Sequence, residues 1–228
     1  MTASLRNDYK SAVRLPPAQQ DTKSALLVVL SSPSGGGKTT IYKRLLKKNP
    51  DFLYSVSVTT RPPRRGEVDG VHYRFVNHKR FQRLIDLNRL AEFATVHGEL
   101  YGTPRQNVVK AIAQKRVMLF DLDVVGGLAL KRQYPETVLI FLTPPSWEVL
   151  RMRMVGRKSE TTAQVQRRLT RARRELPYWR MYDYVVVNEN LTKSVADCLS
   201  IIRAERLRSI RAPRSRRYRP VPIEKLEV

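Results

Sequence analysis

Short, nearly continuous apolar runs recur along the chain, separated by segments in which apolar residues are spaced three or four apart. The runs are rich in Val, Ile, Leu and Phe and cover residues 25–31, 116–123, 137–143 and 182–188. Such runs are typical of strands buried on both faces of a parallel sheet. The helical spacing occurs in "TTIYKRLLKK", "PSWEVLRMRM" and "AQVQRRLTRARREL". Strands that alternate with helices indicate an α/β domain in which helices cover a parallel sheet.

The segment between Phe52 and Tyr101 breaks this alternation. Shorter alternating stretches there flank a loop that contains Pro and Gly, "TTRPPRRGEVDG". We therefore expect a small lobe, at about residues 53–103, inserted into a sheet domain that spans residues 25–211. Residues 1–24 and 212–228 are polar and contain Pro, which is typical of a flexible extension and tail.

Composition bounds the class of protein. The chain has 228 residues, 42% of them hydrophobic, which suits the core of one domain. It contains no apolar run of the ~18 to 20 residues that cross a bilayer and no apolar segment of a secretory signal, so we expect a soluble, cytoplasmic protein. Cys198 cannot form an internal disulfide, and the three histidines (His72, His78, His97) lack the spacing of a zinc site, so neither feature is expected.

The chain is strongly basic. Its 43 Lys and Arg against 20 Asp and Glu give a formal charge of +23. Ten basic residues lie between residues 150 and 180, and seven arginines lie between residues 206 and 219. A positive field attracts nucleotides, nucleic acids and membrane surfaces alike, so charge alone does not choose among these partners.

The stretch "SSPSGGGKTT", residues 31–40, joins the first apolar run to the first predicted helix. Glycines let several backbone N–H groups turn toward a phosphate chain at a helix N-terminus. A lysine at this position reaches the β- and γ-phosphates, and the following hydroxyl ligates Mg²⁺. Ser32 stands where the usual pattern has Gly. We call this stretch the phosphate loop. We expect phosphate and ATP contacts from its residues Ser34, Gly35, Gly36, Gly37, Lys38, Thr39 and Thr40.

Four segments together closely resemble the guanylate kinase family, whose members transfer the γ-phosphate of ATP to GMP. They are the phosphate loop, "SVSVTTRPPRRGEVDGVHYRFV", "LAEFATVHGELYGT" and "LFDLD", in the family's order within about residues 25–208. The resemblance implies a P-loop NTPase-type parallel sheet flanked by helices, a GMP-binding lobe, and a helical, arginine-rich lid at about residues 151–180. It also implies ATP and GMP as substrates and Mg²⁺ as cofactor.

The resemblance further implies a role for individual positions. The residues matching those that hold the GMP phosphate are Arg61, Arg64, Tyr73 and Tyr101. Those matching the guanine-reading residues are Ser57, Glu92, Thr103 and Asp121, and Asp123 belongs to the same strand end. Lid arginines that act in catalysis with Lys38 correspond to Arg153, Arg157 and Arg168. Asn188 matches an asparagine near the ATP ribose. Thr39 is the implied ligand of a phosphate-bound Mg²⁺.

Several positions depart from the family pattern. Val125 replaces a common glutamine, Thr162 and Ala163 replace acidic residues of the lid, and Glu99 and Leu100 replace an Asn and an aromatic residue. None of them has an assigned role in phosphate chemistry, but they leave turnover and nucleotide preference in the lid open.

Three other functions stay open at this stage. An inactive scaffold module of the same family is disfavoured by the phosphate-loop lysine and the GMP-phosphate arginines. A sister kinase that acts on another phosphorylated acceptor is disfavoured by Glu92 and Thr103. A nucleic-acid-binding protein is favoured by the net charge, but the tail carries Tyr218 as its one aromatic residue. We therefore expect a secondary, salt-sensitive attraction of the tail to nucleic acid, without sequence reading. The oligomeric state is not predicted.

Overall fold

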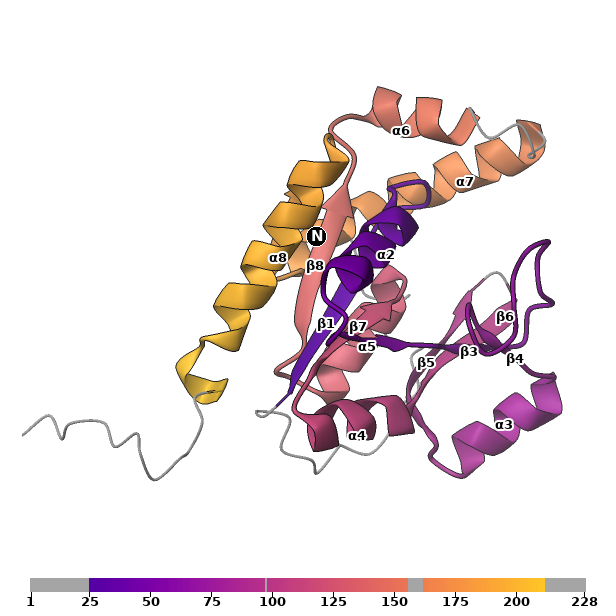
Figure 1. Ribbon diagram of the computed structural model, residues 1–228. Coiled ribbons are helices and arrows are strands. Elements are labelled where there is room, and N and C mark those ends of the chain that lie inside the picture. The colour runs from indigo at the N-terminus through magenta and orange to yellow at the C-terminus, as the bar shows by residue number, and fades with distance from the viewer. Residues whose placement is uncertain (1–24, 97, 156–161, 212–228) are drawn as a thin grey trace, which may run out of the picture.

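Two sheets organise the part of the chain described by this computed structural model, residues 25–96, 98–155 and 162–211 (Figure 1). The larger has the strand order β2 (Leu53–Ser55), β7 (Val117–Asp121), β1 (Leu26–Ser31), β8 (Val138–Thr143) and β9 (Tyr184–Val187). All of its neighbouring strands run parallel. The predicted α/β domain with a parallel sheet is therefore confirmed.

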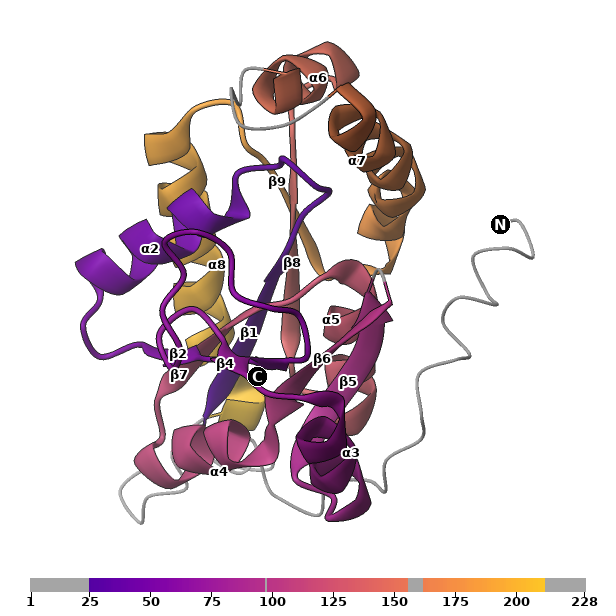
Figure 2. The same ribbon diagram turned by 90° about the vertical axis from the view of Figure 1, so that its right-hand side faces the viewer.

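Helices cover this sheet on both faces (Figure 2). Leu26, Val28 and Leu30 of β1 pack with α2 (Lys38–Lys48) and α8 (Leu191–Arg206) on one face. Leu27 and Val29 pack with α4 (Arg105–Gln114) and α5 (Val124–Gln133) on the other. Every residue of β1 is buried, because the strand is central and its side chains alternate between two covered faces.

The last predicted strand differs from the expectation of burial on both faces. Val186 of β9 packs with the α8 side of the core. Val185 and Val187 point the other way and are 43% and 50% exposed. The strand lies at the edge of the sheet, where none of the described helices covers its second face, so the prediction was wrong for this run.

The lobe is built around a second sheet, with the order β4 (Arg74–Phe75), β3 (Val58–Thr59), β6 (Glu99–Pro104) and β5 (Leu90–Val96). Helix α3 (His78–Asp86) packs Phe81 against Val58 and Leu90. The lobe's sheet begins at Val58. The residues at 53–55, which the sequence analysis placed in the lobe, form β2 of the main sheet and pair with β7.

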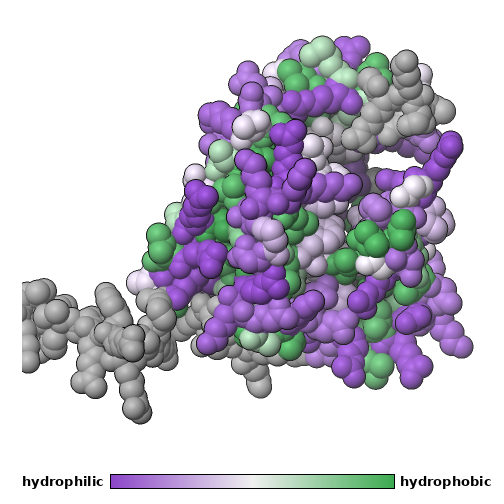
Figure 3. Space-filling view, viewed as in Figure 1, coloured by the Kyte–Doolittle hydropathy of each residue, from purple (hydrophilic) through white to green (hydrophobic). Residues whose placement is uncertain are grey.

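The lid consists of α6 (Trp147–Val155) and α7 (Thr162–Glu175), followed by the 3-10 helix η2 (Leu176–Met181). It lies above the main sheet, opposite the lobe (Figure 1). Leu150 and Met154 of α6 pack against Leu169 and Ala172 of α7. The space-filling view shows a hollow between the lid and the lobe (Figure 3).

The described chain ends in a second 3-10 helix, η3 (Ser209–Arg211). Arg211 donates hydrogen bonds to Ala25 O and to Glu136 O, both at 2.8 Å. None of the described helices is both long and apolar enough to cross a membrane. The expected N-terminal extension (1–24), the basic tail (212–228) and Arg157 lie outside the described residues.

Candidate active site

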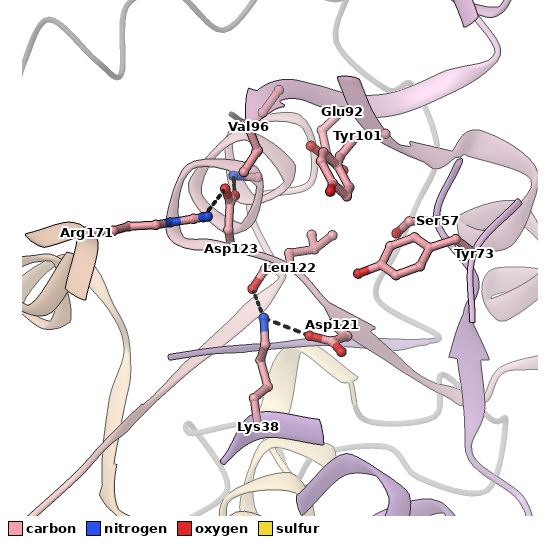
Figure 4. Close-up of a pocket in the computed structure, with 13 residues that line it drawn as sticks. Lys38, Ser57, Tyr73, Glu92, Val96, Tyr101, Asp121, Leu122, Asp123 and Arg171 are labelled. Atoms are coloured by element: carbon pink, nitrogen blue, oxygen red, sulfur yellow. Dashed lines mark hydrogen bonds and ion pairs between the residues drawn. The ribbon is translucent and has the colours of Figure 1, made fainter. Parts of the chain in front are cut away.

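A pocket lies at the carboxyl end of β7, between the phosphate loop, the lobe and α7 (Figure 4). Its lining brings together residues that are far apart in sequence: Lys38, Ser57, Tyr73, Glu92, Ala94, Val96, Tyr101, Gly102, Asp121, Leu122, Asp123, Gly126 and Arg171. Seven of the expected site residues are among them. Open α/β sheets bind ligands at this edge, because the loops that follow the strands meet there.

The phosphate loop connects β1 to α2 in a conformation that requires glycine. Gly37, the N-cap of α2, has φ 89°, and a Cβ there would lie 2.5 Å from Asn188 Nδ2. Gly35 has φ 85°. The Gly36 N–H donates to Pro33 O at 2.9 Å, which closes the turn beside Ser32. The loop therefore ends at a helix N-terminus, where backbone N–H groups attract an anion.

Lys38 follows the glycines of this loop as the first residue of α2. Its Nζ is 2.7 Å from Asp121 Oδ1 and donates to Leu122 O at 2.7 Å. These contacts direct the ammonium group into the pocket (Figure 4). Thr39 and Thr40 follow on the first turn of α2 and are exposed.

Glu92 is the most deeply buried acid of the pocket. It is 4% exposed, and its Oε1 accepts a 2.6 Å hydrogen bond from the buried Thr103 hydroxyl. Burial, assisted by the nearby charge of Asp123, raises the pKa of Glu92 to about 8 against the opposing effect of the Thr103 hydrogen bond. A Cβ at position 126 would lie 3.2 Å from Glu92 Oε2, so Gly126 keeps that oxygen uncrowded. Buried acceptors of this kind bind N–H donors of a ligand strongly.

Two tyrosines line the end of the pocket where the GMP phosphate is expected, and an arginine lies behind them. Tyr73 and Tyr101 pack edge to face with ring centroids 5.9 Å apart. Arg61 Nε donates to Tyr101 Oη at 3.0 Å, although Arg61 itself does not line the pocket. The Arg64 side chain is exposed and does not line it either. The structure thus assembles three of the four expected phosphate ligands and leaves the Arg64 side chain on the loop surface.

Helix α7 rests on the phosphate loop. Arg168 Nε donates to Ser34 Oγ at 3.0 Å, and Glu175 Oε2 accepts the Ser34 N–H at 2.9 Å. Burial raises the pKa of Glu175 against the opposing effect of Arg171. The sequence analysis missed Arg171, which lines the pocket, pairs with Glu175 and lies 3.6 Å from Asp123 Oδ2. The spacing i, i+3, i+7 of residues 168, 171 and 175 places all three on one helix face and is the signal that could have found it.

Two expected site residues support the fold of the site. Asn188 is 6% exposed, and its Nδ2 donates to Gly36 O at 2.8 Å, so its amide holds the phosphate loop. The expected contact with the ATP ribose stays a prediction. Asp123 is the N-cap of α5, and its Oδ1 accepts the Gly126 N–H at 2.8 Å.

Arg153 belongs to the lid but points back to the core. Its Nη2 donates to Asn188 O at 2.8 Å. Its Nη1 is buried and has no hydrogen-bond partner among the described residues. An unpaired buried donor next to a phosphate loop is costly unless a ligand accepts from it.

A metal ion in this site would need ligands from the substrate phosphates as well as from the protein. No group of three or more His, Cys, Asp or Glu side chains within residues 25–96, 98–155 and 162–211 could hold one. Mg²⁺ prefers oxygen ligands and is usually bound through one or two protein oxygens together with phosphates. The exposed Thr39 hydroxyl beside Lys38 fits that donor set.

Comparison with known proteins gives a consistent result. A family model described as guanylate kinase matches residues 24–205. Guanylate kinase of Chelativorans sp. (strain BNC1) is 43% identical over 198 residues, which are 86% of this chain and 91% of that protein. Guanylate kinase of Myxococcus xanthus (strain DK1622) is 46% identical over 184 residues, 80% of this chain and 88% of that protein. The crystal structure of guanylate kinase from Anaplasma phagocytophilum has a TM-score of 0.69 and 34% identity, and the match covers 82% of this chain and 89% of that one.

Proposed function

The chain belongs to the guanylate kinase family, and we propose that the pocket between its phosphate loop, lobe and lid is where the γ-phosphate of ATP is transferred to GMP. Its activity is that of an ATP:GMP phosphotransferase, which yields ADP and GDP. The observation that carries the assignment of the site is the buried Glu92, which accepts a hydrogen bond from Thr103 and lines the same pocket as Lys38. A base-reading carboxylate and a phosphate-binding lysine then face one cavity.

The acceptor binds through its two ends. Glu92 accepts from the N1–H and N2–H₂ groups of guanine, and Ser57, Thr103 and Asp121 complete the base site. Tyr73 and Tyr101 donate hydroxyls to the GMP phosphate, beside the guanidinium of Arg61. These contacts fix the direction of the attacking phosphate oxygen, which is already an anion, so no general base is assigned.

The donor phosphates bind at the other end of the pocket. The backbone N–H groups of Gly35, Gly37 and Lys38, together with the Lys38 ammonium, surround the β- and γ-phosphates. Arg168 and the unpaired Nη1 of Arg153 supply further charge from the lid. When bound through Thr39 and the ATP phosphates, Mg²⁺ would neutralise part of the charge that phosphoryl transfer develops. Lys38, Arg153 and Arg168 stabilise the same developing negative charge. Closure of the lid excludes water from the site.

A coupled ADP-release assay tests this function. With ATP and each nucleoside monophosphate in turn, ADP should form rapidly with GMP, and chelation of Mg²⁺ should abolish it. Equal rates with several monophosphates would indicate a kinase of broader acceptor range. Absence of ADP formation with every acceptor would favour the inactive scaffold module, against which the assembled Lys38–Asp121 end of the pocket already counts.

The basic tail is proposed to attract nucleic acid without taking part in catalysis. Deleting residues 212–228 should leave kcat and KM for GMP within about twofold of the parent and should weaken binding to a single-stranded oligonucleotide at low salt. The measurements are the kinase assay and fluorescence anisotropy at two salt concentrations. If the truncated protein folds but does not phosphorylate GMP, the tail contains an element that catalysis requires, and the prediction is contradicted. The cytoplasmic location expected from the sequence stays a prediction.

A further inference from the structure

The loop between β3 and β4 holds a carboxylate, Glu67, directly against the guanidinium of Arg61. Arg61 Nη1 lies 2.9 Å from Glu67 Oε2, and Nη2 lies 2.9 Å from Oε1. The two side chains are only 12% and 18% exposed. A bidentate pair of this kind fixes both the position and the plane of a guanidinium.

The remaining donors of Arg61 show which of its edges is occupied. A guanidinium has five N–H donors. Nη1 also donates to Pro62 O at 2.6 Å, and Nε donates to Tyr101 Oη at 3.0 Å. The edge formed by Nη1 and Nη2 is therefore used within the loop. The other edge, formed by Nε and the second Nη2–H, faces the Tyr101 hydroxyl that borders the pocket.

Further contacts keep this arrangement rigid. Glu67 Oε2 also accepts the Arg64 N–H at 2.7 Å, which ties the carboxylate to the loop backbone. The Arg61 Cζ lies 5.5 Å from the Tyr73 ring centroid and 5.7 Å from that of Phe75. Partial burial raises the pKa of Glu67, but the hydrogen bonds from Arg61 and Arg64 outweigh it, so the pKa lies below its ordinary value and the carboxylate is ionised.

We propose that Glu67 is a positioning residue for GMP: it holds the Nη edge of Arg61 and thereby presents the second Nη2–H, together with the Tyr101 hydroxyl that Nε holds, to the GMP phosphate. The inference rests on the proposed roles of Arg61 and Tyr101 as phosphate ligands. The charge of Glu67 and its positioning of Arg61 have opposite effects on GMP binding. A carboxylate near a phosphate dianion repels it, so removing the charge alone would strengthen GMP binding. Loss of the positioning of Arg61 would weaken GMP binding. Whether GMP binding becomes stronger or weaker when Glu67 is replaced therefore distinguishes the two effects.

The test is the Glu67→Gln variant, measured with GMP, ATP and guanosine. Gln keeps the shape but cannot accept from both Nη groups. We expect KM for GMP to rise tenfold or more, which corresponds to losing one charge-assisted contact. KM for ATP, and inhibition by guanosine, which lacks the phosphate, should stay within about twofold. A fall or no change in KM for GMP would overturn the inference, and so would an equal loss of guanosine affinity.

Asp69→Asn is the matched control, because it removes one carboxylate charge from the same loop. Asp69 Oδ1 accepts the Phe75 N–H at 2.8 Å, an acceptor role that Asn can keep. We expect KM for GMP to stay within about twofold. If Asp69→Asn raised it as much as Glu67→Gln, general disturbance of the loop would replace positioning as the explanation.

A double-mutant cycle with Arg61→Lys provides a second measurement. Lysine cannot form the bidentate pair, so adding Glu67→Gln to Arg61→Lys should change KM for GMP by less than about twofold. An undiminished effect in that background would also overturn the inference. Failure of the parent protein to phosphorylate GMP would instead contradict the proposed function.

Discussion

Replacing Lys38 by Ala should lower kcat with ATP and GMP by at least about a hundredfold. The ammonium group belongs to the first residue of α2 and lies 2.7 Å from Asp121, where the β- and γ-phosphates are proposed to bind. Removing one preorganised donor to the developing charge typically costs about 3 to 4 kcal/mol, or 10² to 10³ in rate. Steady-state kinetics at saturating ATP and GMP measures the effect.

Lys43→Ala serves as the control for this substitution. Lys43 lies on the same helix, is exposed, and carries the same charge. We expect its kcat to stay within about twofold of the parent, since the charge lies outside the pocket. Turnover of Lys38→Ala within about twofold of the parent would contradict the phosphate-loop assignment. Thermal melting of both variants separates loss of catalysis from loss of fold.

The second large effect concerns the acceptor base: kcat/KM with AMP should be lower than with GMP by roughly 10⁴ or more. Adenine has an unprotonated N1 and no 2-amino group, so it would leave the buried Glu92 without donors. A site that depends on buried hydrogen bonds rejects an unmatched analogue by about this factor. Initial rates with each monophosphate measure the ratio. Comparable rates with AMP and GMP would contradict the assigned role of Glu92.

Glu92→Gln should reduce this discrimination from the GMP side. The amide keeps the volume and can still accept from Thr103, but it cannot ionise when guanine binds and it has one acceptor oxygen fewer. We expect kcat/KM to fall mainly with GMP, so that the gap to AMP narrows. If neither rate changes, guanine is recognised elsewhere.

The stability of Glu92→Gln provides the control, because it should change in the opposite direction to its activity. Burial raises the pKa of Glu92 to about 8 in the folded protein, above the ordinary 4.5. Such a group supports folding fully below the unfolded pKa, and this stability is lost as the pH rises toward 8. Gln has no proton to lose, so at pH 8 the variant should melt at a higher temperature than the parent. A lower melting temperature would attribute its kinetic defect to misfolding.

Local sequence by itself determined the central strands of the main sheet and the glycine turn that follows the first of them. The buried runs predicted β1, β7 and β8 because a strand covered on both faces needs apolar residues at consecutive positions. The three glycines before Lys38 predicted the turn between β1 and α2, since that backbone excludes side chains. The pocket residues Glu92 and Tyr101 were identified by resemblance to a family, because a single acid or tyrosine in an alternating segment carries no periodic signal.

Tertiary structure decided which side chains meet. Lys38 and Asp121 are joined by β1–β7 pairing, and Ser34 and Glu175 by the packing of α7 on the phosphate loop. No periodicity in the chain encodes these distances. The edge position of β9 depends on which strands lie beside it, and the support of Gly36 by Asn188 depends on the end of that strand. Patterns along a sequence report burial and local geometry, whereas contacts between distant segments arise only when the sheet order and helix packing bring them together.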